Sequence, residues 1–78
     1  MSAQADQQLD CKGLACPLPV VKTAQAIKGI DVGQVLELLA TDPGVDPDMR
    51  AWTRRTGHEL MDITKDGDVF HVFIRRTA

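Results

Sequence analysis

The stretch Leu9–Pro19, with the sequence LDCKGLACPLP, marks the point where a first strand passes through a loop into a first helix. Apolar and charged residues alternate up to Lys12, as in a short strand, and Gly13 then breaks the pattern. Pro17 and Pro19 favour the first turn of a helix, where a missing backbone N–H loses no partner. This stretch therefore predicts a β-α unit whose connecting loop carries a cysteine.

The rest of the chain repeats this alternation of strands and helices. The spacing of apolar residues predicts helices over 17–28 and 47–56, with Asp46 as the N-cap of the second and Gly57 at its end. Runs rich in Val and Leu or alternating in polarity predict strands over 34–41, 58–65 and 69–75, the last two joined by a hairpin at Asp66-Gly67. The residues expected to face the core are Val20, Val21, Ala24, Ile27, Leu36, Leu38, Ala40, Met49, Trp52, Thr56, Phe70, Val72 and Ile74.

The order β-α-β-α-β-β predicts a two-layer α/β sandwich of the α+β class, in which two helices cover one face of a four-stranded mixed sheet. A chain of 78 residues has room for one small hydrophobic core. We therefore expect residues 9–78 to form a single domain. Residues 1–8 are polar and show no periodicity, which favours a flexible N-terminal tail.

Composition argues against several classes of function. Nine Lys and Arg against eleven Asp and Glu give a net charge of -2, and the chain has no Tyr, so we expect no nucleic-acid partner. No apolar run approaches the roughly 20 residues of a membrane helix, and the first residues lack the pattern of a signal peptide. The expected location is the cytoplasm. His58 and His71 have no neighbouring Cys or His at metal-ligand spacing, so no metal site is expected.

Cys16 is the residue that points to chemistry, because it directly precedes the two prolines at the start of the first predicted helix. As the N-cap it would face the positive end of the helix dipole, with the Leu18 N–H available to an anionic sulfur, and both effects favour the thiolate. The alternative is a small cysteine that only packs near the core. Taken alone, these residues indicate a reactive cysteine without choosing between sulfur transfer, peroxide sensing and disulfide exchange.

The same residues resemble the signature of the TusA/SirA family of sulfur carriers, in which a strand with Asp is followed by Gly-Leu and then Cys-Pro-x-Pro. Later landmarks also resemble that family, so the likeness extends from Leu9 to about Arg76: Gly33 before a Val/Leu strand, Ala40-Thr41-Asp42-Pro43-Gly44 and Thr56-Gly57-His58-Glu59-Leu60. The stretch Asp46-Pro47-Asp48 departs slightly from the family pattern. The resemblance implies the same fold and a cysteine that accepts sulfur as a persulfide.

By this resemblance the persulfide falls on Cys16, with Pro17, Leu18, Pro19 and Gly13 supporting the site and no cofactor. The implied partners are a sulfur donor, either a cysteine desulfurase or a rhodanese-like protein, and a protein that accepts the sulfur. Such a chain is a carrier, most simply a monomer, rather than a multiple-turnover enzyme on a small substrate. The implied pathways are transfer RNA thiolation, molybdenum-cofactor assembly and sulfur oxidation.

Two other functions stay open on the sequence. Cys11 and Cys16 could form a disulfide switch, although the strand pattern places Cys11 on the inner face with Leu9 and favours a packed thiol. The domain could also be a regulatory adaptor that does not use Cys16. Asp10 could be an acceptor within its loop or could tune the site. The pairs Arg54-Arg55 and Arg75-Arg76 are expected in solvent, and His58 could cap the second helix as a cation.

Overall fold

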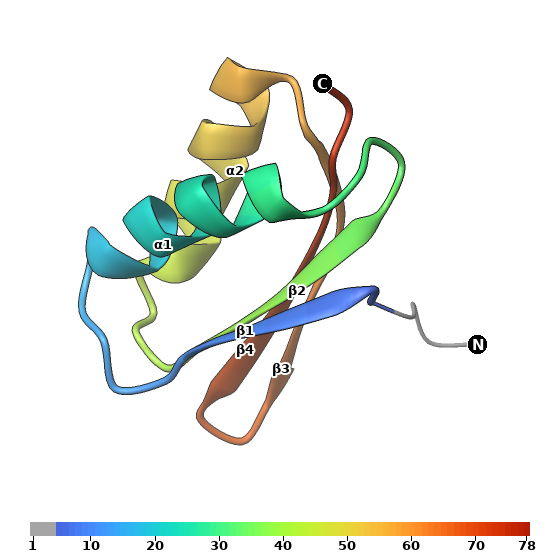
Figure 1. Ribbon diagram of the computed structural model, residues 1–78. Helices are drawn as coiled ribbons and strands as arrows, with labels where there is room; N and C mark the ends of the chain where they lie inside the picture. Colours follow the sequence, from blue (N-terminus) through green and yellow to red (C-terminus); the bar gives the residue numbers. More distant parts are fainter. Residues whose placement is uncertain (1–4) are drawn as a thin grey trace.

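The computed structural model describes residues 5–78, and within them two helices cover one face of a four-stranded sheet (Figure 1). The strands are β1 (Gln7–Cys11), β2 (Val35–Ala40), β3 (Glu59–Asp66) and β4 (Val69–Arg75). The helices are α1 (Leu18–Ala26), which a 3₁₀ turn continues over Ile27–Gly29, and α2 (Val45–Thr56). This order confirms the two-layer α/β sandwich predicted from the sequence. No helix in the described range is long and apolar enough to cross a membrane.

Strand β1 begins earlier than the sequence predicts. Gln7 and Gln8, which we expected in the tail, pair with β2. Asp6 extends this edge, because its N–H donates to the Val35 carbonyl and its carboxylate accepts the Val35 N–H, both at 2.8 Å. Because these hydrogen bonds are made with the neighbouring strand β2, the polarity of Asp6, Gln7 and Gln8 alone does not predict them. Residues 1–4 of the expected tail lie outside the described range.

The strand order β1-β2-β4-β3 makes the sheet mixed, with β1 parallel to β2 and the other two pairs antiparallel. Strands β3 and β4 form the predicted hairpin around Gly67, whose φ of 61° suits a tight turn. Because β1 and β2 run in the same direction, their carboxyl ends lie at the same end of the sheet (Figure 1). The loops before α1 and α2 therefore meet there.

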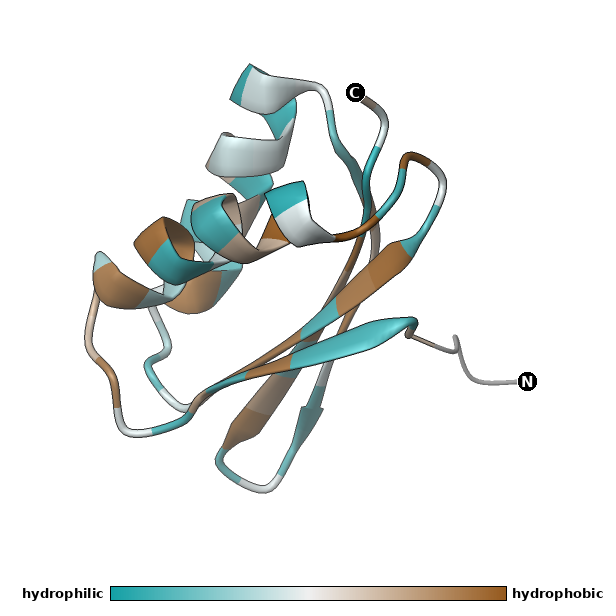
Figure 2. Cartoon of the chain, in the orientation of Figure 1, coloured by the Kyte–Doolittle hydropathy of each residue, from teal (hydrophilic) through white to brown (hydrophobic). Residues whose placement is uncertain are grey.

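The core lies between the helices and the inner face of the sheet. Figure 2 shows the apolar residues concentrated in β2 and β4 and the polar ones along β1. Alternate residues of the two central strands point inward, as predicted, and five of them expose no surface: Leu36, Leu38, Ala40, Val72 and Ile74. Phe70, also predicted to face inward, is partly buried against this cluster.

The buried face of α1 differs from the prediction at one position. Val21, expected inside, is 45% exposed, whereas Thr23 is completely buried. The Thr23 hydroxyl donates to the Pro19 carbonyl at 2.8 Å, so the buried hydroxyl is satisfied within its own helix. A pattern based on polarity alone assigns such a threonine to the wrong face.

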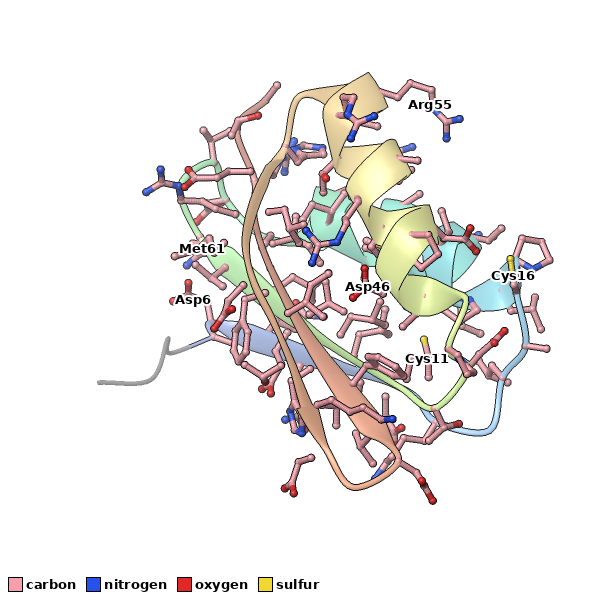
Figure 3. All side chains as sticks on the ribbon, turned by 180° about the vertical axis from the view of Figure 1, so that it is seen from behind. Asp6, Cys11, Cys16, Asp46, Arg55 and Met61 are labelled. Carbon is pink, nitrogen blue, oxygen red and sulfur yellow. The ribbon has the colours of Figure 1, made fainter. Side chains whose placement is uncertain are left out.

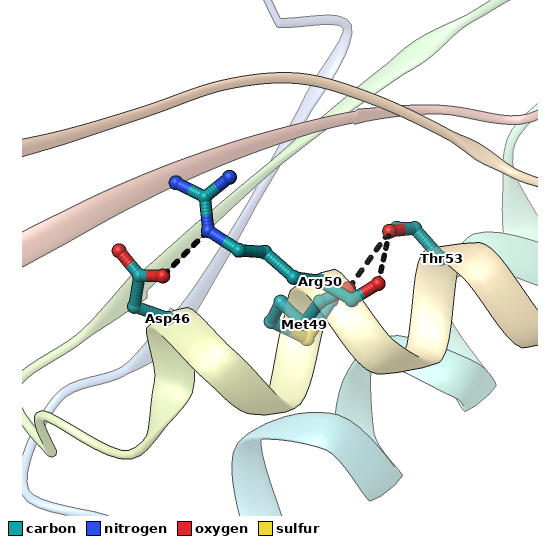
Figure 4. A network of polar contacts seen from close by, with 4 residues as sticks. All are labelled: Asp46, Met49, Arg50 and Thr53. Carbon is teal, nitrogen blue, oxygen red and sulfur yellow. Dashed lines mark hydrogen bonds and ion pairs between the residues drawn. The ribbon is translucent and has the colours of Figure 1, made fainter.

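Helix α2 begins at Val45 with Gly44 as its N-cap, so the prediction of Asp46 as the N-cap is wrong. Asp46 instead lies in the first turn and accepts a hydrogen bond from Arg50 Nε at 2.7 Å (Figure 4). A carboxylate in the first turn is stabilising there without capping the helix. The Asp46 carboxylate therefore interacts within its own helix.

The inner stripe of α2 differs from the expected one in one threonine. Met49 and Trp52 are buried as predicted, but Thr56 is exposed and Thr53 is 4% exposed. Thr53 donates through its hydroxyl to the Met49 carbonyl at 2.9 Å (Figure 4). As in α1, a threonine bonded within the helix lies in the core.

Gly57 ends α2 in the left-handed conformation, with a φ of 85° and its N–H bonded to the Thr53 carbonyl. Gly57→Ala should lower the free energy of unfolding by about 1 kcal/mol, because a side chain is disfavoured at this φ. The reduced conformational freedom of the unfolded alanine variant offsets part of that cost. Urea denaturation measures the change. Gly29→Ala is the matched control, because Gly29 does not have a positive φ and a Cβ added there would lie in open space. An equal loss in both variants would contradict the assignment of strain to Gly57.

Candidate functional site

Two hydrogen bonds tie the loop before α1 to the loop before α2. The Gly13 N–H donates to Thr41 Oγ1 at 3.0 Å, and the Cys16 N–H donates to Asp42 Oδ2 at 2.7 Å. Gly13 has a φ of 81°, a conformation that favours glycine. The parallel pairing of β1 and β2 thus places Cys16 against residues that lie 26 positions further along the chain.

Cys16 is exposed and directly precedes the N-cap of α1, so it is not itself the N-cap that we predicted. Pro17 occupies that position, and the peptide bond between the two residues is cis. The Leu18 N–H donates to the Ala15 carbonyl at 2.9 Å and not to the sulfur. The helix terminus therefore does not supply the hydrogen bond expected to favour the thiolate.

The partner of the Cys16 sulfur is a carboxylate from the other helix. Cys16 Sγ lies 2.6 Å from Asp48 Oδ2, in the first turn of α2. This hydrogen bond, together with partial desolvation and the negative charges of Asp48 and Asp42, raises the pKa of Cys16. The expectation of a favoured thiolate is thus corrected, because a protonated thiol donates to Asp48.

Asp42 organises the backbone around this contact. Its carboxylate accepts the N–H groups of Cys16, at 2.7 Å, and Gly44, at 3.1 Å, and these bonds hold the pKa of Asp42 below its ordinary value. A Cβ built on Gly44 would lie 3.5 Å from an Asp42 oxygen and 3.8 Å from an Asp48 oxygen. Both carboxylates therefore border the same glycine, next to the sulfur.

Sequence reasoning did not single out Asp42 or Asp48 as site residues. Asp42 entered only within a stretch that resembles the TusA/SirA family, and Asp48 only within a stretch that departs slightly from the family pattern. One signal could have found them. When the strands of two β-α units pair in parallel, the loops that follow them lie at the same end of the sheet. Acidic residues after the second strand therefore lie close to a cysteine after the first strand.

The residues predicted to support the site have different surroundings. Leu18 is 45% exposed beside Cys16. Pro19 is buried on the inner side of α1, and Pro17 is exposed. Apolar surface therefore lies next to the sulfur on α1.

A shallow groove of about 220 Å³ lies between the two helices at the sulfur. It is largely apolar, with one carboxylate and one guanidinium at its sides. Figure 3 shows the Cys16 side chain at the outer edge of the molecule, where the chain enters α1. The lining residues are Cys16, Pro17, Val20, Asp48, Ala51, Trp52 and Arg55.

Cys11 lies in a different environment. Its side chain exposes no surface, as the strand pattern predicted, and Figure 3 shows it in the interior beneath α2. Burial raises the pKa of the Cys11 thiol, so this thiol resists ionisation. Both cysteines are free. One thiol is therefore open to a partner and the other is enclosed by the core.

The remaining candidates serve structure. Asp10 Oδ1 accepts the Lys12 N–H at 2.9 Å, so its carboxylate closes its own loop. His71 Nδ1 lies 2.8 Å from a carboxylate oxygen of Glu37. Arg76, expected in solvent, donates to the carbonyls of Ile30 and Ala78. No group of three side chains suited to a metal ion occurs within residues 5–78.

His58 does not act as the cationic cap considered for α2. Its ring stacks on Trp52 with the ring centroids 5.4 Å apart, and its Nδ1 accepts the Thr77 N–H at 3.2 Å. Burial and the nearby Arg76 lower the pKa of His58, which favours the neutral ring. His58 instead anchors the end of the chain against α2.

The sequence matches the family described as Sulfurtransferase TusA over residues 7–76. The YrkI protein of Bacillus subtilis is 42% identical over 73 residues, which cover 94% of this chain and 97% of that protein. The sulfur carrier protein TusA of Allochromatium vinosum is 41% identical over 75 residues, which cover 96% and 99% of the two chains.

A solved structure agrees with the fold. The crystal structure of a SirA-like protein from Desulfitobacterium hafniense superimposes with a TM-score of 0.79 and 22% identity, over 92% of this chain and 99% of that one. At this identity the likeness concerns the architecture alone. The family match spans all four strands and both helices. The chain therefore belongs to the sulfurtransferase TusA family.

Proposed function

We propose that this protein is a sulfur carrier that holds a sulfane sulfur atom as a persulfide on Cys16 and passes it to an acceptor protein. The observation that carries the proposal is the position of Cys16, an exposed thiol fixed at the junction of two loops, while Cys11 is enclosed. A relative with 41% identity is named a sulfur carrier protein, which supports the same role here.

The proposed loading step moves one sulfur atom between two cysteines. The Cys16 thiolate attacks the outer sulfur of a persulfide on the donor, and a new S–S bond forms as the donor's S–S bond breaks. The donor cysteine leaves as a thiolate and takes up a proton equivalent to the one that Cys16 released. Delivery repeats the exchange with an acceptor thiol as the nucleophile. No external oxidant or reductant is needed.

The proposed partners are proteins. A donor of the cysteine desulfurase or rhodanese-like class and an acceptor protein would each need to approach Cys16 closely. The groove is shallow and does not enclose a substrate, while Leu18 offers apolar contact area beside the sulfur. These features support a carrier that meets other proteins rather than a multiple-turnover enzyme on a small substrate. The proposed carrier acts as a monomer.

The proposed setting is the cytoplasm, with the sulfur destined for transfer RNA thiolation, molybdenum-cofactor assembly or sulfur oxidation. Two free cysteines suit a reducing compartment. The acceptor decides among these three destinations, and each is tested by reconstituting transfer with the corresponding relay protein.

Intact mass spectrometry after loading tests the carrier role. Wild type, Cys11→Ser and Cys16→Ser are each incubated with a cysteine desulfurase and cysteine, or with polysulfide. We expect wild type and Cys11→Ser to gain the mass of one sulfur atom that reduction removes, and Cys16→Ser to gain none. Loss of two hydrogens without added sulfur would instead indicate a disulfide between Cys11 and Cys16, and no change with any donor would favour the adaptor role.

A further inference from the structure

We propose that Asp48 is a positioning residue that holds the empty carrier in a protected state, by accepting a hydrogen bond from the Cys16 thiol that the sulfur-loaded form cannot make. This inference rests on the proposed carrier role of Cys16. It adds a residue on α2 to a site that the sequence placed entirely at the start of α1.

The contact requires a proton on the sulfur. Cys16 Sγ and Asp48 Oδ2 are 2.6 Å apart, and an ionised carboxylate only accepts hydrogen bonds. A thiol supplies the donor. A thiolate has no proton, and neither has the inner sulfur of a persulfide, which is bonded to carbon and to the outer sulfur. Of the three forms of this side chain, only the empty, protonated one can donate this hydrogen bond through Sγ.

The charges around the sulfur oppose its ionisation. Asp48 faces it from α2 and Asp42 from the loop before α2, while Arg55 lines the same groove. No ion pair joins Arg55 to either carboxylate in the part of the chain described here. The Asp42 carboxylate is held ionised by two backbone N–H groups. Negative charge therefore dominates at the sulfur and keeps the thiol protonated.

Protection and release follow from the same contact. Thiolates, not thiols, react with peroxides and disulfides, so a protonated Cys16 is spared those reactions while it waits for a donor. Once the outer sulfur is attached, the donated hydrogen bond is gone and an ionised persulfide would face the Asp48 carboxylate. Repulsion between like charges then turns the loaded side chain away from α2 and toward the solvent, where an acceptor attacks.

A control variant separates the proposed role of Asp48 from a purely structural one. An acidic residue in the first turn of a helix stabilises it through the helix dipole, and Asp46 has the same charge in the same turn. Asp46 is paired with Arg50 (Figure 4). The carboxylates that act on the sulfur are those of Asp48 and Asp42. Asp46→Asn is therefore the matched control, because it removes one charge from the same turn without touching Cys16.

The test is the pH dependence of Cys16 alkylation by iodoacetamide in the unloaded protein. Asp48→Asn should move the midpoint of the rate profile to lower pH, and Asp46→Asn should leave it in place. For each unit by which the pKa falls, the thiolate fraction below the midpoint rises about tenfold and its nucleophilicity falls about threefold. We therefore expect Asp48→Asn to react faster than wild type near pH 7, by about threefold for each unit by which the pKa falls.

An unchanged midpoint in Asp48→Asn, or an equal shift in Asp46→Asn, would overturn the proposal. Circular dichroism checks that the variants fold, and Asp48→Ser offers a second replacement if the Asn variant does not. Alkylation needs no sulfur donor, so its result is separate from that of the loading experiment. A shifted midpoint without sulfur loading would support the hydrogen bond between Cys16 and Asp48 and reject the carrier role. Sulfur loading without a shifted midpoint would support the carrier role and reject the proposed role of Asp48.

Discussion

Cys16→Ser protein that has been treated with a sulfur donor is expected to release no thiocyanate when cyanide is added. Cyanide attacks the outer sulfur of a persulfide, forms a C–S bond and leaves the cysteine as a thiolate. A serine hydroxyl forms no persulfide, and the only other thiol, Cys11, is enclosed by the core. Wild type should release thiocyanate in proportion to its loaded fraction, measured by the absorbance of the ferric complex.

Cys11→Ser is the matched control for this loss. It makes the same replacement of sulfur by oxygen at the other cysteine of the chain. Its thiocyanate yield should equal that of wild type, provided the variant is assayed at a temperature where it stays folded, because Ser places a hydroxyl in an apolar position. Equal yields from Cys16→Ser and wild type would reject Cys16 as the carrier residue.

Leu38→Ala should reduce the free energy of unfolding by about 2–5 kcal/mol. Leu38 lies in the central strand β2 and exposes no surface, so its truncation removes buried apolar contacts and leaves a cavity. Marginal stability makes this a large loss for so small a domain. Thermal unfolding followed by circular dichroism measures it, with an expected fall in Tm of about 4–8 °C for each kcal/mol.

Leu18→Ala is the control for this prediction, since it removes the same atoms from a residue that is 45% exposed. Its effect should stay below about 1 kcal/mol, because an exposed position leaves no cavity. If the two leucine variants lost equal stability, the core would not lie where the structure places it, between the helices and β2.

The sequence predicted the inner face of the sheet well, because a period of two leaves little choice about which residues of a central strand share one face. Leu36, Leu38 and Ala40 all lie where the alternation placed them. The helices were less predictable. Thr23 and Thr53 are buried because each hydroxyl bonds to a carbonyl of its own helix, and hydropathy does not register that bond.

The site shows the same division between local and distant information. The exposed position of Cys16 before a helix follows from neighbouring prolines and from the family resemblance. Its electrostatic environment does not, because Asp42 and Asp48 reach it through the pairing of β1 with β2 and the packing of α2. Local reasoning therefore predicted a favoured thiolate, and the tertiary contacts reverse that expectation.

Peptide mapping of the loaded wild-type protein tests the carrier account most directly. After loading, the free thiols are blocked, the protein is digested, and the fragments containing Cys11 and Cys16 are separated by mass spectrometry. The account predicts one additional sulfur atom on the Cys16 fragment, removed by prior reduction, and none on the Cys11 fragment. Additional sulfur on Cys11, or a disulfide joining the two fragments in place of added sulfur, would contradict it.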